Sequence, residues 1–198
     1  MDNCLIYDFE TMGEVKECAA VSLALYKFNE DRFLTNPYSY MEIVDNCKYI
    51  KFDIQEQVQK YDRVIEKATL EWWAKLPVEA RSIINPSPND VSISDLWNHL
   101  TEYTSGMDFK KVYTRGNSYD PIIMENLLHV TGFGVPYPWW TIRDTRSTIE
   151  GLSWGSGLKH SFIVEECKDQ FVAHDARHDI AMDVMRLQTL VQTLYGDG

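Results

Sequence analysis

The stretch Leu5-Ile6-Tyr7-Asp8-Phe9-Glu10 decides the fold, because it runs from a short apolar segment directly into two acids. Leu5–Tyr7 predicts a buried strand, and Asp8 and Glu10 follow it two residues apart. Side chains at that spacing in a strand point to the same face of the sheet. Like charges on one face repel each other, and a bound divalent cation offsets such repulsion. A solvated strand end with two acids is the alternative that this stretch alone leaves open.

The segment from His174 to Asp179 favours the cation over the solvated strand end. It is followed by apolar residues at helical spacing, which are Ile180, Val184, Leu187, Val191 and Leu194. This pattern predicts a long terminal helix. Asp175 suits its N-cap, so His174 would precede the helix and Asp179 would lie inside it. With Asp8 and Glu10, the chain then carries Asp-x-Glu and, far downstream, His-x-x-x-x-Asp.

Asp120 supplies the acid expected between these two motifs. It follows the predicted strand Lys111–Thr114 and stands directly before Pro121. Asp before Pro is also typical of a helix start, where Asp caps free backbone N–H groups. The sequence therefore leaves open whether Asp120 is a metal ligand, an N-cap, or both.

These motifs resemble those of the DEDDh 3′→5′ exonucleases, in the DnaQ-like and ribonuclease H-like superfamily. The His lies five residues before the last Asp, as in the DEDDh subtype. Similarity to the exonuclease A (DexA) family of T-even-type bacteriophages extends in the same order through nearly the whole chain. The matching segments are Asp8–Gly13, Ile50–Asp53, Glu71–Trp73, Pro77–Arg81, Arg115–Asp120, Arg143–Arg146 and Phe171–Asp175. The wider superfamily often has Asn four residues before the middle Asp; here that position is Gly116, with Asn117 beside it.

The resemblance implies an α/β fold, with a ribonuclease H-like mixed sheet flanked by helices and with residues 1–198 as a single exonuclease domain. Local patterns agree, because strands come first and strands alternate with helices later. They predict an antiparallel meander of Leu5–Tyr7, Val21–Phe28 and Phe33–Tyr40. They also predict a helix through Trp72 and Trp73 with Thr69 as its N-cap. Further helices are predicted over Ile93–Tyr103, Pro121–His129 and Thr145–Leu152.

By the same resemblance, Asp8, Glu10, Asp120 and Asp179 would hold two divalent cations per site, Mg²⁺ or Mn²⁺. Asp8 would bridge both cations, Glu10 and Asp179 would complete the shell of the one that holds the attacking water, and Asp120 would support the other. Such hard cations prefer oxygen ligands. His174 would be the general base, because a neutral imidazole with an ordinary pKa of about 6.5 accepts a proton near neutral pH.

Two other residues of the predicted terminal helix have ionisable side chains near this motif. His178 lies one position before Asp179, so the helix turns it away and we assign it no role. Asp183 lies one turn beyond Asp179, and we expect a solvated carboxylate there, with a role in supporting the ligands as the alternative.

Seven residues are candidate contacts to the nucleic acid: Phe9, Thr11, Met12, Trp72, Trp73, Arg115 and Asn117. Apolar side chains beside the first motif of related enzymes wedge against terminal bases, although core packing is equally open for Phe9. Neighbouring helical residues diverge by about 100°, so one of Trp72 and Trp73 at most should face a groove and stack on a base. Arg115 could hold a phosphate or form an ion pair.

Composition limits the classes of protein that remain. A length of 198 residues with 44% hydrophobic residues suits one globular domain. The net charge of −11 argues against a broad basic surface for nucleic acid. Four widely spaced cysteines without Cys-x-x-Cys argue against a zinc ribbon or a disulfide framework and favour a reducing cytoplasm, that of the bacterial host if the chain is phage-encoded. No stretch reads as a membrane span or a signal peptide.

We therefore expect a metal-dependent 3′→5′ exonuclease that releases 5′-mononucleotides from single-stranded DNA with a free 3′ end. The polarity and the preference for DNA come from the resemblance. An exoribonuclease with the same site is the first alternative, because recognition of RNA requires a contact to the 2′-hydroxyl that no motif reveals. A nucleic-acid-binding phage protein without turnover is the second. Nothing in the sequence indicates an oligomeric state.

Overall fold

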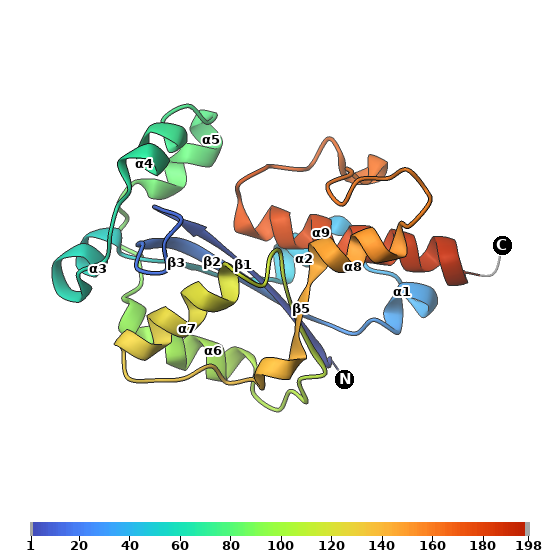
Figure 1. Cartoon of the computed structure of the whole chain (residues 1–198), viewed down its shortest axis with the longest axis horizontal. Coiled ribbons are helices and arrows are strands. Elements are labelled where there is room, and N and C mark those ends of the chain that lie inside the picture. Colours follow the sequence, from blue (N-terminus) through green and yellow to red (C-terminus); the bar gives the residue numbers. More distant parts are fainter. Residues whose placement is uncertain (1, 197–198) are drawn as a thin grey trace.

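One mixed sheet of five strands organises the computed structural model, which describes residues 2–196 and, at Glu79, the backbone alone (Figure 1). The strands are β1 (Cys4–Thr11), β2 (Ala20–Phe28), β3 (Lys48–Lys51), β4 (Lys111–Thr114) and β5 (Ile142–Asp144). Their order is β3-β2-β1-β4-β5; β1 and β3 run antiparallel to β2, whereas β1, β4 and β5 are parallel. β1 is thus the central strand, and the predicted α/β fold class is confirmed.

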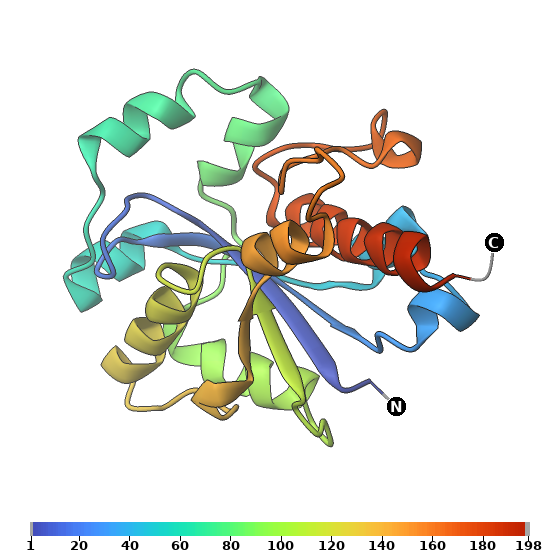
Figure 2. The same ribbon diagram turned by 45° about the vertical axis from the view of Figure 1, so that its right-hand side comes forward.

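Helices cover both faces of this sheet. One face packs against α1 (Arg32–Thr35), α2 (Tyr40–Asn46), α8 (Thr145–Leu152) and α9 (Ala176–Tyr195), and the other against α6 (Leu96–Tyr103) and α7 (Asp120–Val130). The segment with α3 (Ile54–Tyr61), α4 (Lys67–Trp73) and α5 (Val78–Arg81) lies near the end of the sheet where β1 ends (Figures 1 and 2). Short 3₁₀ turns span Ser82–Ile84, Ile93–Asp95, Trp139–Thr141 and Glu165–Cys167. None of the helices within residues 2–196 is long and apolar enough to cross a membrane.

The alternation of β1 separates its acids from its apolar residues. Cys4 and Ile6 belong to the apolar cluster that includes α2 and α9, whereas Leu5, Tyr7 and Phe9 belong to the cluster under α6 and α7. Side chains two residues apart share a face. Asp8 and Glu10 therefore continue the row of Cys4 and Ile6 on the α9 face. The pairing of β1 with β2 stays regular through both acids and shifts only between Glu10 and Thr11.

The predicted third strand over Phe33–Tyr40 is wrong. α1 occupies the start of that stretch, and β3 is the strand that pairs with β2. A capping box begins α2, because the Ser39 hydroxyl accepts the backbone N–H of Glu42 and the Glu42 carboxylate accepts that of Ser39. The aromatic residues that suggested a strand are buried against β2 instead; Phe33 stacks on Phe28 with ring centroids 5.9 Å apart.

Most predicted helices occur, with differences at their ends. α4 begins after Glu66, so Thr69 lies within the helix and is not its cap. Asp175 caps α9 as predicted, since its carboxylate accepts the backbone N–H of Arg177. α9 is the longest helix of the described chain and lies along the sheet, with its first turn near the carboxyl end of β1 (Figure 1).

Candidate active site

Four acids meet where β1 ends and where α7 and α9 begin. Asp8 and Glu10 project from β1 toward α9, Asp120 is the first residue of α7, and Asp179 lies in the first turn of α9. Asp120, Asp179 and Glu10 each raise the pKa of Asp8 by charge repulsion, which is the electrostatic signature of their proximity. The structure therefore brings together the four acids that the spacing in the sequence singled out.

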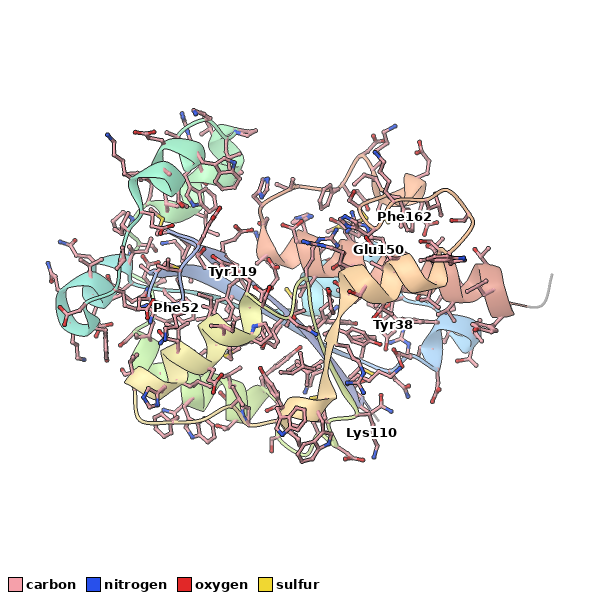
Figure 3. The ribbon with its side chains drawn as sticks, viewed as in Figure 1. Tyr38, Phe52, Lys110, Tyr119, Glu150 and Phe162 are labelled. Carbon is pink, nitrogen blue, oxygen red and sulfur yellow. The ribbon has the colours of Figure 1, made fainter. Side chains whose placement is uncertain are left out.

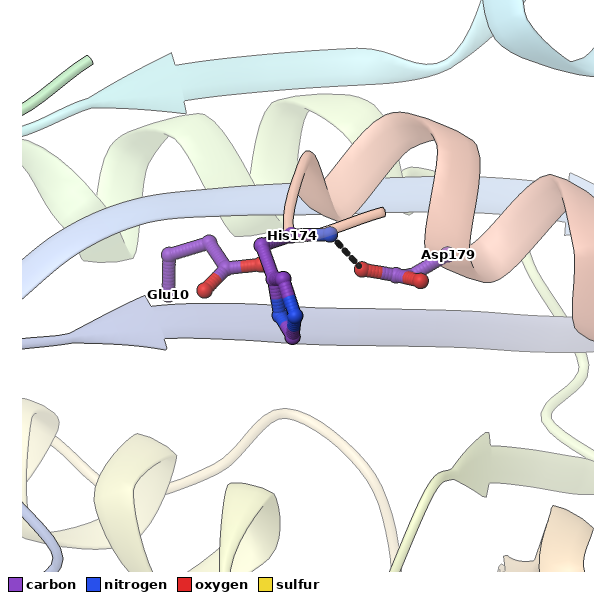
Figure 4. Close-up of side chains that lie close together, drawn as sticks. All are labelled: Glu10, His174 and Asp179. Atoms are coloured by element: carbon purple, nitrogen blue, oxygen red, sulfur yellow. Dashed lines mark hydrogen bonds between the residues drawn. The ribbon is translucent and has the colours of Figure 1, made fainter. Parts of the chain in front are cut away.

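Two of these acids are held by backbone groups rather than by cations. Asp120 accepts the N–H of Phe9 over 3.1 Å, and Asp179 accepts the N–H of His174 over 3.0 Å (Figure 4). Such bonds orient a carboxylate and leave its charge in place. α7 has no side-chain cap, so the capping role that was open for Asp120 is not observed. Its carboxylate ties α7 to β1 instead.

The four acids of this cluster all have raised pKa values. Burial, followed by mutual repulsion, holds the pKa of Asp8 and of Glu10 well above the ordinary range. Burial raises the pKa of Asp120 and of Asp179 to about 7. No Lys or Arg in residues 2–196 forms an ion pair with any of the four. A set of carboxylate oxygens without a cationic side chain fits hard divalent cations such as Mg²⁺ or Mn²⁺.

His174 stands at the edge of the acid cluster. One imidazole nitrogen, one Glu10 oxygen and one Asp179 oxygen all lie within 4.8 Å of one another, a spacing that could also hold a cation (Figure 4). Burial lowers the pKa of His174. The imidazole is therefore neutral at neutral pH, the state that a proton acceptor needs.

His178 and Asp183, which flank Asp179 on α9, contrast with each other. His178 faces away from the acids, and its Nδ1 shares a 2.7 Å hydrogen bond with the Tyr40 hydroxyl. Asp183 is 2% exposed, so the predicted solvated carboxylate is wrong. It accepts hydrogen bonds of 2.6 Å from Arg186 Nη1 and from the Thr145 hydroxyl.

Arg115 is also bound to Asp183, through its Nη1. Its Nη2 lies 3.1 Å from His160 Nδ1, so both terminal nitrogens are engaged within the protein. Arg115 therefore forms the ion pair that was one of its two alternatives, and contact to a phosphate stays a prediction. Arg186 completes this arrangement by donating from Nε to the Phe162 carbonyl over 2.6 Å, which ties the loop around Phe162 to α9 (Figure 3).

Three of the predicted substrate contacts are core residues. Phe9 is buried on the α7 face, edge-on to Tyr7 with ring centroids 6.1 Å apart. Met12 and Trp73 share a small apolar cluster at the end of β1, and Trp73 is fully buried. The prediction of Phe9 and Trp73 as base contacts is corrected, because alternation along β1 and rotation along α4 turn these side chains inward. Met12, which follows β1, is 3% exposed and is held in the cluster with Trp73, so its prediction as a base contact is corrected as well.

The remaining candidates differ in availability. Thr11 is buried, and its hydroxyl donates to the Gly13 carbonyl over 2.8 Å and lies 2.5 Å from the Tyr119 hydroxyl. The sequence analysis did not single out Tyr119 as a site residue, although it immediately precedes Asp120; Figure 3 labels its position. Asn117 is exposed and Trp72 is 39% exposed, so contact to substrate stays a prediction for these two.

A groove of about 390 Å³ adjoins His174. Its walls include Tyr49 and Lys51 of the β3 edge, the α9 residue Arg177, and Ile83 from the segment after α5. The Arg177 guanidinium lies over the Tyr49 ring, 4.7 Å from its centroid. The groove therefore brings an aromatic ring and two cationic side chains to the border of the acid cluster.

Comparisons with known proteins show the family of this chain. Residues 3–190 match the family described as the 3′-5′ exoribonuclease Rv2179c-like domain. The chain is 30% identical over 208 residues to an exodeoxyribonuclease of Enterobacteria phage T4, covering 96% of this chain and 90% of that protein.

Solved structures of exonuclease I have the same fold. The zinc-bound complex of the E. coli enzyme with single-stranded DNA matches with a TM-score of 0.63 and 14% identity, over 97% of this chain and 40% of that one. A complex with a dT13 oligonucleotide matches with the same score and identity, over 97% and 41%. This chain spans about two fifths of exonuclease I, and at such identity the likeness shows the fold alone. From the family match and the phage relative, the chain belongs to the Rv2179c-like 3′-5′ exoribonuclease domain family and is a DnaQ-like exonuclease related to the phage exonuclease A proteins.

Proposed function

We propose that this exonuclease is metal-dependent, works from the 3′ end, and releases 5′-mononucleotides from single-stranded DNA. The observation that carries the proposal is the cluster of four acids without a cationic partner, next to a neutral imidazole. Like charges held together in a buried site raise the free energy of the folded chain unless a cation binds between them. A protein that retains such a cluster on rigid elements has the means to bind divalent cations.

Asp8, Glu10, Asp120 and Asp179 would hold two cations, and Mg²⁺ or Mn²⁺ suits their oxygen ligands. When bound, two such cations lower the pKa of an attacking water, neutralise charge on the phosphate and stabilise the leaving oxygen. The Asp120 carboxylate is held by the backbone N–H of Phe9 in β1, and the Asp179 carboxylate by the backbone N–H of His174 just before α9, so these two ligands are oriented before any cation arrives. Residues 1–198 would act as one exonuclease domain, because the acids come from both ends of the chain.

His174 would accept the proton of the attacking water at an imidazole nitrogen. The new bond joins the water oxygen to phosphorus, and the bond that breaks joins phosphorus to the 3′-oxygen of the preceding nucleotide. The terminal nucleotide then leaves with a 5′-phosphate, and the shortened strand has a new 3′-hydroxyl. The bond from the backbone N–H of His174 to the Asp179 carboxylate holds the main chain of the proton acceptor next to a proposed metal ligand.

The groove beside His174 suits the strand that leads to the site. The Arg177 guanidinium, supported by the Tyr49 ring beneath it, offers a flat cationic surface for a base or phosphate, and Lys51 adds positive charge, a combination that suits sequence-tolerant binding to single strands. Both of these basic side chains also have acidic partners, since Lys51 pairs with Asp90 and Arg177 pairs with Asp175. We therefore expect moderate, salt-sensitive binding rather than a strong electrostatic clamp.

An exoribonuclease is the second candidate, because the family that matches the chain is described by that activity. DNA is favoured because the phage relative, which aligns with 96% of the chain, is named an exodeoxyribonuclease. The two readings differ in whether the site accepts or excludes a 2′-hydroxyl.

Matched DNA and RNA oligonucleotides, labelled at either end in turn, test this proposal. With Mg²⁺ or Mn²⁺, we expect mononucleotides from the 3′ end of single-stranded DNA, slower digestion of blunt duplex, and no reaction in EDTA. Faster digestion of RNA would establish the second candidate. Release from the 5′ end, or equal rates in EDTA, would contradict the proposal. Binding without any product, in every metal tested, would identify a nucleic-acid-binding protein that has lost turnover.

A further inference from the structure

The backbone of His174 adopts a conformation that is unfavourable for a residue with a side chain. Its φ angle is +64°, in the left-handed region that glycine tolerates best. A residue other than glycine keeps this backbone conformation only when its surroundings stabilise it, and such strained residues are frequent at functional sites. The position of the imidazole ring therefore depends on the contacts that His174 makes with its neighbours.

Those contacts are few. The backbone N–H is bound to Asp179, which fixes the main chain but leaves the ring free to turn about its side-chain bonds. Within residues 2–196 the imidazole nitrogens form no hydrogen bond. The only ring in that part of the chain that contacts the imidazole is that of Trp72 in α4, whose centroid lies 4.7 Å from that of the imidazole at an interplanar angle of 86°. This edge-to-face geometry is the favourable arrangement for an aromatic pair.

Trp72 is itself anchored to the strand that carries the acids. The neighbouring Trp73 is fully buried, and its indole N–H donates to the Thr11 carbonyl over 3.0 Å. The rings of Trp72 and Trp73 are also in edge-to-face contact, with centroids 5.2 Å apart. Thr11 follows Glu10 directly in β1. The end of β1 thus determines where α4 lies, and α4 determines where the Trp72 ring meets the imidazole.

We propose that Trp72 is a positioning residue, which holds the imidazole of His174 toward Glu10 and Asp179. The inference rests on the proposed role of His174 as the proton acceptor. It assigns Trp72 a function other than the base stacking expected from the sequence. Trp72 is 39% exposed, and this exposure is compatible with the role, because the imidazole contacts one side of the indole ring only.

Two substitutions at Trp72 separate these functions. Trp72→Leu removes the aromatic contact, whereas Trp72→Phe keeps a ring in the same place. We expect kcat to fall by about 3- to 10-fold in Trp72→Leu, which corresponds to the strength of one aromatic pair, with KM unchanged. Trp72→Phe should restore most of kcat. Trp154→Leu is the matched control, because Trp154 is 90% exposed and should behave as wild type.

A double mutant tests whether Trp72 acts through His174. In a His174→Ala background, Trp72→Leu should cause no further loss of kcat, because the imidazole that it positions is gone. An equal loss in both backgrounds would overturn the inference. So would a rise in KM at constant kcat, since that result identifies Trp72 as a base contact.

A measurement without turnover completes the test. In protein with isotope-labelled histidine, Trp72→Leu should move the NMR signals of the His174 ring and leave those of His178 in place, with His174→Ala providing the assignment. Unmoved His174 signals in an active enzyme would overturn this inference alone. A wild-type protein without nuclease activity would overturn the proposed function and the inference with it.

Discussion

Asp179 and Asp183 lie one turn apart on α9, yet their surroundings are opposite. Asp183 is bound by two guanidinium groups and a hydroxyl, from Arg115, Arg186 and Thr145. Asp179 accepts a backbone N–H and faces the carboxylates of Asp8 and Glu10. Both acids come from the same helix, so residue type and secondary structure do not distinguish them. The guanidinium groups of Arg115, from outside α9, and of Arg186, on α9 itself, make Asp183 a structural residue. Within residues 2–196 no ion pair holds Asp179, which we propose as a metal ligand.

This contrast has an energetic consequence that can be measured. Removal of one partner from a buried ion pair leaves an uncompensated charge and destabilises the fold. Removal of one acid from a repelling cluster relieves strain in the metal-free protein. Substitutions in the two places should therefore change stability in opposite directions and should change turnover to different degrees.

The largest expected effect is at the centre of the cluster. Asp8→Ala should abolish nucleotide release in Mg²⁺ and leave the fold intact, with equal or greater thermal stability than wild type in EDTA. The reason is that Asp8 is repelled by Asp120, Asp179 and Glu10 in the apo protein. Product release in Mg²⁺ and melting curves in EDTA measure both parts. Full activity would remove Asp8 from the metal site.

The next effect concerns the proposed base. His174→Ala should lower kcat by roughly 10²–10⁴-fold, the usual contribution of a positioned base, while metal and DNA binding persist. His178→Ala should behave nearly as wild type, because that ring is bound to Tyr40. Activity of the wild type should fall on the acid side, where the His174 imidazole becomes protonated. Burial lowers its pKa, so this fall should occur below its ordinary value of about 6.5.

Rates across pH for the three proteins, with DNA affinity measured in Ca²⁺, test that assignment. If His178→Ala were the inactive variant, His178 rather than His174 would be the proton acceptor, and the proposed assignment would be wrong.

The structural acid should show the opposite behaviour. Asp183→Ala should destabilise the metal-free protein by about 3–5 kcal/mol, because it leaves the Arg186 guanidinium buried without its partner. Urea unfolding in EDTA, side by side with Asp8→Ala, measures the difference. Asp183→Asn is the matched control; it keeps a hydrogen-bond acceptor and should lose less. Equal stabilities for Asp8→Ala and Asp183→Ala would show that the two places do not differ as described.

The last prediction concerns the response of stability to pH. Burial raises the pKa of Asp120 and of Asp179 to about 7, against about 3.9 in an unfolded chain. The folded state therefore binds more protons than the unfolded state between about pH 4 and pH 7. These groups should make the metal-free protein less stable as pH rises through that window. Asp175, whose pKa is lowered by Arg177 despite burial, acts in the opposite direction at more acidic pH.

Cations compete with these protons, so added Mg²⁺ should raise the melting temperature more at about pH 8 than at about pH 6. Melting curves across this range, in EDTA and in excess Mg²⁺, measure the effect. Asp8→Ala should weaken it. A metal-free protein that gains stability up to pH 8 would contradict the raised pKa values.

The periodicity of strands and the capping of helices predicted, from the sequence alone, where Asp8, Glu10, His174 and Asp179 lie on their own elements. The two-residue period of a strand placed Asp8 and Glu10 together, and the Asp175 cap placed His174 and Asp179 at the start of α9. The same rules failed for Phe33–Tyr40, where buried aromatic residues imitate a strand. The capping box of Ser39 and Glu42 was the signal for a helix there.

Only the tertiary structure decided which charges are compensated. Arg115 lies 68 residues from Asp183 along the chain, and Thr145 lies 38 residues from it. The contact of Trp72 with His174 likewise joins α4 to the start of α9. A periodic pattern states which face of its own element a residue occupies, and it carries no information on what another element brings to that face. The sequence by itself therefore placed each acid on its own element, whereas packing decided that Asp183 pairs with Arg115 and Thr145 and that Asp179 faces Asp8 and Glu10.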